Sequence, residues 1–279
     1  METVTIVGVG LIGGSFALAL RKAGFSGKIL GVSSPRTIEA ALARRVIDAG
    51  LPLEQAAPRA DLVYLAQPIS RIAETLGRLD PVLAPGCLVT DAGSTKAAIV
   101  DRARRAIRRC QFLGGHPMAG KEKRGVEEAD PDLFVGRTYV LTPVDRAELE
   151  TPAAKNFLDW IRRIGALPVV LSPVDHDRIV AHTSHLPQLA STALASTLAD
   201  RQDVRAHLVV AGPGLADTTR LALSAYEIWG DILATNAGEI ERALNAYISK
   251  LEALRARLRN DQMRREFERA ADFARRLRT

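Results

Sequence analysis

The feature that most restricts the fold is a glycine-rich stretch at the start of the chain, METVTIVGVGLIGGSFALALRKAG. Residues 3–7 are apolar and β-branched, as in a buried strand, and residues 15–23 have the pattern of a helix. Between them lie Gly8, Gly10 and Gly13, in the spacing G-x-G-x-x-G. In such a strand-turn-helix the first glycine permits a tight turn, the second lets the backbone approach a pyrophosphate, and the third lets the helix pack closely on the strand. The stretch therefore predicts a dinucleotide site at a helix N-terminus, where N–H groups face the anion.

The same stretch has two other interpretations. It resembles a signal peptide or a membrane segment, but the acidic Glu2 stands where a basic leader is expected. A spanning helix needs about 20 mainly apolar residues, and glycines weaken so short a run. In the second interpretation the glycines only fit a tight turn and bind nothing. We expect neither export nor a membrane partner. The turn residues expected to bind the cofactor are Gly8, Gly10, Leu11, Ile12 and Gly13.

Composition sets wide limits. The 279 residues are 47% hydrophobic and 25% charged, which suits one large domain or two modest ones. The two cysteines, Cys87 and Cys110, lie in no CxxC motif, so we expect no disulfide framework and no metal site, and a reducing cytoplasm fits best. Net charge is +6, and the densest basic run is at residues 102–109. Alanine and isoleucine alternate with these arginines, as on the solvated face of a helix, so we expect no nucleic-acid partner.

The order of elements predicts an α/β protein of two domains. Short apolar strands alternate with helical patterns up to about residue 172, which is typical of a parallel sheet covered by helices. The expected strands are residues 3–7, 28–32, 62–66, 88–90, 112–113, 139–141 and 168–171. The clearest helices between them are residues 37–46 and 153–164, and Trp160 is expected in the core. The fold class is therefore a Rossmann-type doubly wound sheet in residues 1–172.

The second half is expected to be helical throughout. No strand pattern follows Ser172-Pro173, and residues 173–279 form the expected all-α domain. The expected helices are residues 175–183, 186–199, 214–223, 226–236 and 238–275. Leucine, isoleucine and alanine recur at heptad-like spacing, which often buries an apolar stripe against a second subunit. We therefore predict a homodimer formed through the helical domain.

The end of the second strand bears on which dinucleotide binds. In NAD-binding units an acidic residue follows about 20 residues beyond the third glycine and bonds the ribose. Here that position is Ser33, in the text GVSSPRT. Hydroxyl donors and a guanidinium suit a 2′-phosphate, which a carboxylate would repel. The sequence favours NADP, with NAD possible and with Arg36 as a solvated helix residue in the other interpretation. The residues expected at this end are Ser33, Ser34, Arg36 and Thr37.

Four further segments carry groups able to do chemistry. They are TDAGSTK at 90–96, GGHPMAG at 114–120, SHLPQ at 184–188 and DTTR at 217–220. Glycines and a proline fix the shape of the second loop around one imidazole, which is costly unless the loop is used. Taken singly, each group also has a structural explanation. These are His116 as a turn residue, Ser94 as a helix cap, His185 as a buried junction residue and Arg220 in a surface salt bridge.

Together these segments resemble the prephenate/arogenate dehydrogenase family of tyrosine biosynthesis. The resemblance covers nearly the whole chain, through VGVGLIGGS, DAGSTK, GGHPMAG, LFVGRTYVLTP, HDRIVAHTSHLP and DTTRLALSAYEIWGDIL. HPMAG followed by SHLP at this separation is specific, whereas G-x-G-x-x-G is not. The resemblance implies a Rossmann domain, a helical dimerisation domain and a site between them. It also implies oxidative decarboxylation of a cyclohexadienol.

The resemblance also implies roles for individual residues. His116 is implied as the acceptor for the proton of the ring hydroxyl, for which a neutral imidazole of pKa about 6.5 is suited. Ser94 is implied to orient that histidine, and Arg220 to hold the ring carboxylate through its bidentate fork. The remaining implied site residues are Ser184 and His185, facing the small-molecule substrate, and Gln67 and Pro68, beside the nicotinamide.

The sequence departs from the family at one substrate position. Many relatives have a second histidine at the end of the SHLP segment, whereas this chain has Gln188. A neutral amide suits arogenate, whose side chain carries both an ammonium and a carboxylate, better than it suits the anionic prephenate. We therefore expect Gln188 in the substrate site and arogenate as substrate, with prephenate as the alternative.

Two other kinds of protein could be built in this way. One is another two-domain NADP-dependent dehydrogenase or reductase, which usually needs a catalytic lysine in the second domain. Lys155 and Lys250 are poorly placed for that role. The other is a non-catalytic NADPH sensor, which would keep the glycines but would need neither His116 nor Arg220.

Overall fold

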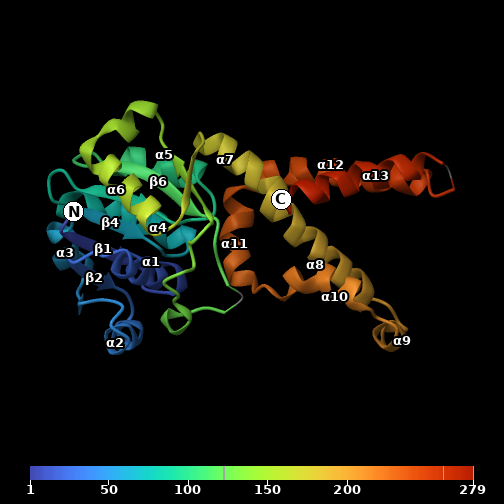
Figure 1. Cartoon of the computed structure of the whole chain (residues 1–279), viewed down its shortest axis with the longest axis horizontal. Coiled ribbons are helices and arrows are strands. Elements are labelled where there is room, and N and C mark those ends of the chain that lie inside the picture. The colour runs from blue at the N-terminus through green and yellow to red at the C-terminus, as the bar shows by residue number, and fades with distance from the viewer. Residues whose placement is uncertain (122, 260, 279) are drawn as a thin grey trace.

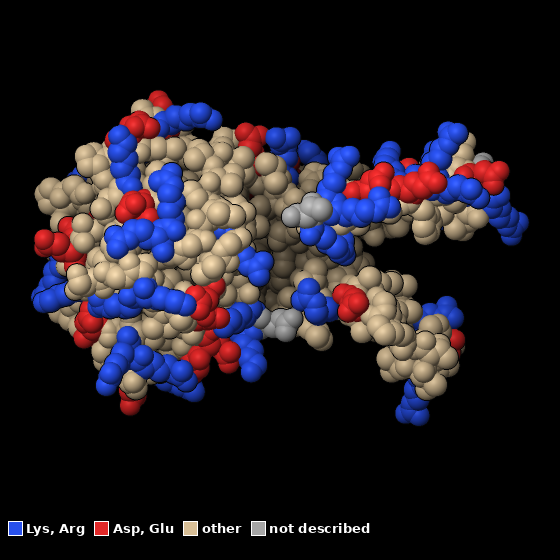
Figure 2. All heavy atoms as spheres, in the orientation of Figure 1, with Lys and Arg blue, Asp and Glu red and all other residues tan. Residues whose placement is uncertain are grey.

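The protein consists of a sheet-containing domain and a helical domain that projects from it (Figure 1). The structure, a computed structural model, describes residues 1–121, 123–259 and 261–278. The helical domain divides into two arms, which the space-filling view shows as separate projections with a gap between them (Figure 2). Within the described ranges, no helix combines the length and the apolar character needed to cross a bilayer.

The sheet has eight strands in the order β3-β2-β1-β4-β5-β6-β7-β8. Because β1 lies between β2 and β4, the strand order reverses at β1, where doubly wound folds bind ligands outside the carboxyl ends of the strands. The strands are β1 (Thr3–Val7), β2 (Lys28–Val32), β3 (Ala49–Gly50), β4 (Leu62–Leu65), β5 (Leu88–Asp91), β6 (Gln111–Pro117), β7 (Thr138–Thr142) and β8 (Leu167–Val170). The expected α/β class is confirmed, and the short β3 is an addition to the expected strands.

The expected all-parallel sheet is wrong at one pair of strands. β7 runs antiparallel to β6, with Gly114 opposite Thr142 and His116 opposite Val140. A parallel neighbour needs a long crossover, usually through a helix. Between Pro117 and Thr138 the described residues form only the short 3-10 helix η3 (Val126–Glu128), so the chain returns beside β6 in the opposite direction.

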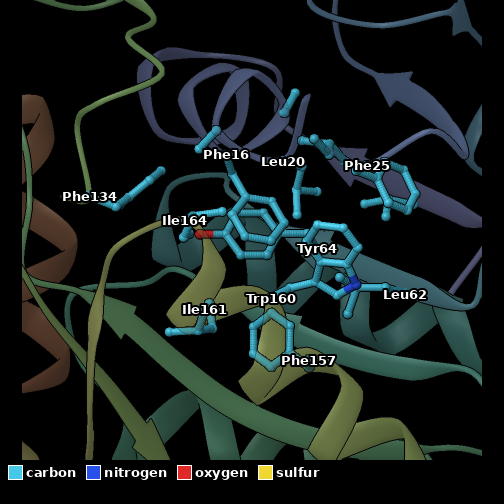
Figure 3. Close-up of a cluster of buried hydrophobic side chains, with 14 of the residues drawn as sticks. Phe16, Leu20, Phe25, Leu62, Tyr64, Phe134, Phe157, Trp160, Ile161 and Ile164 are labelled. Carbon is cyan, nitrogen blue, oxygen red and sulfur yellow. The ribbon is translucent and has the colours of Figure 1, made fainter. Parts of the chain in front are cut away.

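In the described part of the sheet domain, six α-helices have their apolar faces on the sheet. They are α1 (Leu11–Lys22), α2 (Pro35–Ala43), α3 (Leu53–Ala56), α4 (Ile69–Leu79), α5 (Ala97–Ala106) and α6 (Pro152–Arg163). On one side of the sheet the core is aromatic, with Phe16 of α1 stacked on Tyr64 of β4 at 4.1 Å between ring centroids (Figure 3). Trp160 of α6 meets Phe25 edge to face at 5.4 Å, so its expected place in the core is confirmed.

The helix boundaries expected at the glycine turn and in the basic run are wrong, for different reasons. α1 begins at Leu11 rather than at residue 15, because the glycine turn itself enters the first helical turn, where the Gly14 N–H bonds the Gly10 carbonyl. α5 ends at Ala106, so the basic run at 102–109 is not one continuous helix face. Past its end, the backbone N–H groups of residues 108 and 109 both donate to one carboxyl oxygen of Asp80.

The helical domain follows β8 after two residues. Ser172 caps its first helix by accepting a hydrogen bond from the Asp175 N–H at 3.0 Å, and we propose 172/173 as the domain boundary. Its elements are α7 (Pro173–Val180), the π-helix η5 (Ala181–His185), α8 (Leu186–Ala199), α9 (Val204–Val209), α10 (Pro213–Thr219), the 3-10 helix η6 (Arg220–Leu223), α11 (Tyr226–Thr235), α12 (Ala237–Ala256) and α13 (Gln262–Arg276).

The long terminal helix expected at 238–275 is wrong. The chain turns after α12, and α13 runs back beside it to form one arm of the domain (Figure 1). Lys250 of α12 pairs with Glu266 of α13 at 2.9 Å, and Leu254, Phe267 and Phe273 line a groove between the two helices. A single straight helix would hold these groups far apart, so the contacts between the two halves favour the hairpin.

The two domains are joined by direct hydrogen bonds. Asp231 of α11 accepts the Ser70 N–H at 2.8 Å, in the first turn of α4. The hydroxyls of Thr95, just before α5, and Thr235, at the end of α11, lie 2.8 Å apart. Both contacts lie at the carboxyl edge of the sheet, so the helical domain covers the edge at which ligands are expected.

Candidate active site

The three glycines of the first turn have three different surroundings. A Cβ on Gly8, which has φ +94°, would lie 2.6 Å from the Ala66 carbonyl oxygen, and one on Gly13 would lie 2.1 Å from the Gly8 oxygen. A Cβ on Gly10 would meet nothing within 4 Å. Gly10 is the N-cap of α1, where the first N–H groups have no partner within the helix. The turn thus combines close packing at Gly8 and Gly13 with open space at Gly10, which fits a bound pyrophosphate.

The residues expected at the adenosine end lie together after β2. Ser33, Ser34 and Arg36 are exposed there, at the start of α2. The Ser34 hydroxyl accepts the Thr37 N–H at 3.3 Å and lies 2.9 Å from the Thr37 hydroxyl. Ser34 therefore has a structural role as the cap of α2, and its contribution to a cofactor stays a prediction.

Gln67 and Pro68 follow β4, next to the glycine turn. A Cβ on Gly8 would lie 2.9 Å from Cγ of Gln67, and the side-chain oxygen Oε1 of Gln67 accepts the Thr75 hydroxyl at 2.8 Å. Pro68 is exposed and precedes α4. Gln67 thus borders the turn that fits a dinucleotide, and the expected place of both residues beside the nicotinamide stays a prediction.

A fully buried ion pair fixes the backbone just before His116. Lys96 and Asp91 form this pair, and neither is exposed to solvent. The Lys96 ammonium also donates to the Gly115 carbonyl at 2.7 Å, and the other Asp91 oxygen accepts the Gly115 N–H at 3.1 Å. Burial lowers the pKa of Lys96, and the neighbouring Asp91 opposes that shift. The backbone of Gly115, next to His116, is therefore held at both its N–H and its carbonyl.

His116 connects the sheet domain to the helical domain. Its Nδ1 lies 2.8 Å from Nε2 of His176, and Nδ1 of His176 lies 2.7 Å from a carboxyl oxygen of Asp177. Asp177 also accepts the N–H groups of Lys96 at 2.7 Å and Ala97 at 2.9 Å. A line of three side chains thus runs from the end of β6 through the start of α7 to the N-terminus of α5.

Sequence reasoning missed His176 and Asp177. The signal available was the adjacent His-Asp pair in the first turns of the helix after Ser172-Pro173. Ser94 is half-buried on the loop before α5, and the described contact on Nδ1 of His116 comes from His176. The orienting role implied for Ser94 stays a prediction.

The surroundings of His116 favour its neutral form. Its side chain is half-buried, and burial lowers its pKa well below 6.5, helped by the neighbouring His176, Lys96 and His185. A group of lowered pKa stays unprotonated down to a lower pH than an exposed imidazole. At neutral pH one nitrogen of His116 therefore has a free lone pair, which is what a proton acceptor requires.

His185 lies close to the same network. It is buried, and burial lowers its pKa to about 4. Asn236 approaches Nδ1 of His185 at 3.3 Å and donates to the Asp177 backbone oxygen at 2.9 Å. The Trp229 ring meets His185 edge to face at 5.9 Å between centroids. Ser184 precedes His185 on the π-helix and is half-buried.

Gln188 makes a separate contact within the helical domain, with the short helix that includes Arg220. Gln188 is buried, and its amide donates to the Leu221 carbonyl at 2.8 Å. It thereby holds η6, the short helix that begins with Arg220. Arg220 is exposed, and its convergence with His116 on one ligand stays a prediction.

Comparisons with known proteins match both domains of this chain. The family model for the prephenate dehydrogenase nucleotide-binding domain matches residues 16–167, and that for the prephenate dehydrogenase dimerization domain matches residues 172–272. Prephenate dehydrogenase of Lactococcus lactis is 35% identical over 85% of this chain and 65% of the relative. That of Bacillus subtilis is 31% identical over 98% of this chain and 75% of the relative. The chain thus spans about two thirds to three quarters of these relatives.

Solved structures match over both domains. Prephenate dehydrogenase from Aquifex aeolicus, in complex with hydroxyphenyl propionate and NAD+, has a TM-score of 0.85 and 32% identity, covering 100% of this chain and 96% of that one. Synechocystis arogenate dehydrogenase has a TM-score of 0.81 and 31% identity, covering 99% and 98%. The two family models, the relatives and the shared two-domain fold give one conclusion: the chain belongs to the prephenate/arogenate dehydrogenase family.

Proposed function

We propose that this protein catalyses the NADP-dependent oxidative decarboxylation of arogenate to tyrosine. The observation that carries the proposal is His116, an imidazole kept neutral by its surroundings at the carboxyl edge of a dinucleotide-binding sheet. Prephenate is the second candidate substrate, because the most similar relatives named above are prephenate dehydrogenases.

The reaction needs a proton acceptor and a group that holds a carboxylate. The bound nicotinamide supplies the acceptor for the hydride that leaves the ring carbon bearing the hydroxyl. As the C–H bond breaks, His116 takes the hydroxyl proton and the C–O bond becomes a carbonyl. Arg220 holds the ring carboxylate through paired hydrogen bonds. The bond to that carboxylate then breaks as CO2 leaves, its electrons complete the aromatic ring, and the oxygen regains a proton to give a phenol.

The choice of arogenate rests on charge at the side-chain end of the substrate. Gln188 brings no charge to the position where many relatives have histidine, and a neutral site suits a side chain that carries both an ammonium and a carboxylate. The amide also donates to the Leu221 carbonyl, next to Arg220, so its effect on the substrate can act through the placement of Arg220.

The test of the function is a comparison of four assays. Purified protein is mixed with arogenate or prephenate, each with NADP or NAD, and reduced nicotinamide is followed by its absorbance. We expect the highest kcat/KM with arogenate and NADP. A higher kcat/KM with prephenate than with arogenate would instead identify prephenate as the substrate. Absence of turnover with both substrates would refute it and favour the reductase or sensor interpretation.

Arg36→Ala is expected to lower kcat/KM for NADP by about 10-fold while leaving kcat/KM for NAD within about twofold, since a charge-assisted contact to phosphate is worth 1.5–3 kcal/mol. Steady-state kinetics with each cofactor measures the change. Arg44, exposed just after α2, gives a matched control in Arg44→Ala, which should alter neither value. Equal loss with both cofactors would mean that Arg36 does not recognise the 2′-phosphate.

Gly10→Ala and Gly13→Ala are expected to separate binding from folding. A Cβ at Gly10 meets only open space, so the variant should keep its thermal stability but lose affinity for NADP by about 10-fold or more, because the new methyl group stands where the pyrophosphate approaches. A Cβ at Gly13 would lie 2.1 Å from a backbone oxygen, and the overpacking should cost about 1–3 kcal/mol of stability. Calorimetry and NADP titration measure both. Unchanged affinity in Gly10→Ala would exclude the turn as the pyrophosphate site.

We also propose that the protein is a homodimer held by its helical domain. The family model that matches residues 172–272 describes a dimerization domain. Large apolar side chains on the helical arms are exposed to solvent, and one of the two arms has a mostly uncharged surface in Figure 2. Examples of these side chains are Leu208 at 69%, Val209 at 85%, Val210 at 82%, Leu223 at 84% and Leu277 at 75%. Burial of this apolar area against a second copy would stabilise the pair.

A further inference from the structure

The side chain of Asp177 is held in place by main-chain donors. One carboxyl oxygen accepts the Lys96 N–H at 2.7 Å and the other accepts the Ala97 N–H at 2.9 Å, at the N-terminus of α5. The positive charge of the Lys96 ammonium also interacts electrostatically with Asp177. The negative charge of Asp177 is thus stabilised by two N–H groups at a helix N-terminus.

His176 lies between this carboxylate and His116, with no exposed surface. Its Nδ1 is 2.7 Å from a carboxyl oxygen of Asp177, which can only accept, so Nδ1 must carry a proton and donate it. In the neutral form of His176, the proton on Nδ1 leaves Nε2 unprotonated. In that state Nε2 of His176 has a lone pair and can only accept.

The position of the ring proton on His116 follows in the same way. Its Nδ1 lies 2.8 Å from Nε2 of His176, so a hydrogen bond between them requires a proton on Nδ1 of His116. A neutral His116 protonated on Nδ1 has its lone pair on Nε2. The other charged or titratable groups around His116 are Lys96, which is paired with Asp91, and His185, whose pKa is lowered to about 4.

We propose that Asp177 and His176 are positioning residues that hold the proton of His116 on Nδ1 and keep Nε2 as the acceptor. They belong to the helical domain, whereas His116 lies on the sheet, so the domain contact itself selects the reactive tautomer. The use of Nε2 on a substrate hydroxyl rests on the proposed function. The tautomer is a property of the protein without substrate, and can be tested separately.

The direct test is ¹⁵N NMR of the histidine rings in the full-length protein without ligand. Protonated and bare ring nitrogens have well-separated shifts, and single His→Gln variants assign each ring. We expect neutral rings with the proton on Nδ1 for both His116 and His176. A proton on Nε2 of His116, or a doubly protonated His176, would overturn the proposal even if the enzyme is active.

The functional test compares His176→Gln with His182→Gln. A glutamine amide can rotate so that it either accepts from or donates to His116, and it has no ring Nδ1–H held by Asp177, so His116 should become a mixture of two tautomers. We expect kcat to fall by about 10-fold or more with KM within about twofold, since general-base catalysis is worth 10²–10⁴-fold. His182 is exposed and bonds the Arg178 carbonyl in its own helix, so His182→Gln should change neither the NMR signals of His116 nor kcat.

The outcomes separate this proposal from the proposed function. Unchanged kcat in a folded His176→Gln variant of an active enzyme would overturn the positioning role. If the wild-type protein converts neither arogenate nor prephenate, the proposed function fails, and the NMR result still decides the tautomer. If His176→Gln does not fold, the wild-type spectrum alone tests the proposal.

Discussion

His116→Asn is expected to lower kcat by about 100-fold or more while NADP still binds, because a general base contributes 10²–10⁴-fold to the rate. Asparagine reaches about as far as Nδ1 of histidine, so its amide can still donate to His176 and keep the contact now at 2.8 Å. It has no group in the position of Nε2, and the proton of the substrate hydroxyl would lose its acceptor. Steady-state kinetics at saturating substrate gives kcat, and NADP titration gives the affinity.

The control for this variant is His182→Asn. His182 is exposed on the π-helix, outside the line of side chains that includes His116, so turnover should be unchanged. If His116→Asn retained wild-type turnover, His116 would not be the proton acceptor. If the variant lost NADP binding as well, the loop would have a role in shaping the cofactor site, and the loss of turnover could not be assigned to proton transfer.

Lys96→Met is expected to destabilise the protein by about 3–5 kcal/mol, since removing one partner of a buried ion pair leaves the other charge without compensation. Both side chains of the pair have zero exposure, and methionine fills much of the volume of the lysine stem. Asp91 would keep only its bonds from the Gly93 and Gly115 N–H groups. The free energy of unfolding from urea titration measures the loss.

A surface ion pair provides the comparison. Lys22 and Asp132 lie 2.6 Å apart, but their side chains are 58% and 53% exposed. Lys22→Met should therefore cost no more than about 1 kcal/mol, since solvent screens such a pair. If the two variants lost the same stability, the buried pair would not be the main support of the loop before His116.

Local sequence patterns predicted the sheet domain well because its elements are short and their signals are local. The alternation of strands and helices, the glycine turn and the core position of Trp160 were all readable from neighbouring residues. Errors arose where distant segments decide the outcome. The direction of β7 depends on how the chain returns after Pro117, where the described residues form only a short 3-10 helix. The turn between α12 and α13 depends on contacts between residues 16 positions apart, such as Lys250 and Glu266.

The candidate active-site residues show the same division. GGHPMAG identified His116 because glycine and proline constrain a loop locally, and SHLP identified His185 as a residue of the domain junction. His176 was visible as one of five histidines, but nothing in its neighbourhood revealed that it lies 2.8 Å from a residue 60 positions earlier. Lys96 likewise stood in a recognised segment, while its burial against Asp91 and Gly115 was not predictable from spacing.

The sequence by itself determined the class of the protein: an α/β domain with a glycine turn for a dinucleotide, a helical domain, and an imidazole on a constrained loop. These properties depend on backbone preferences and periodicity, which act over a few residues. Only the tertiary structure decided which groups surround that imidazole, because the contact of α7 with β6 and α5 brings His176 and Asp177 to it from another domain. Protonation depends on burial and on neighbouring charges in space, and spacing along the chain does not contain that information.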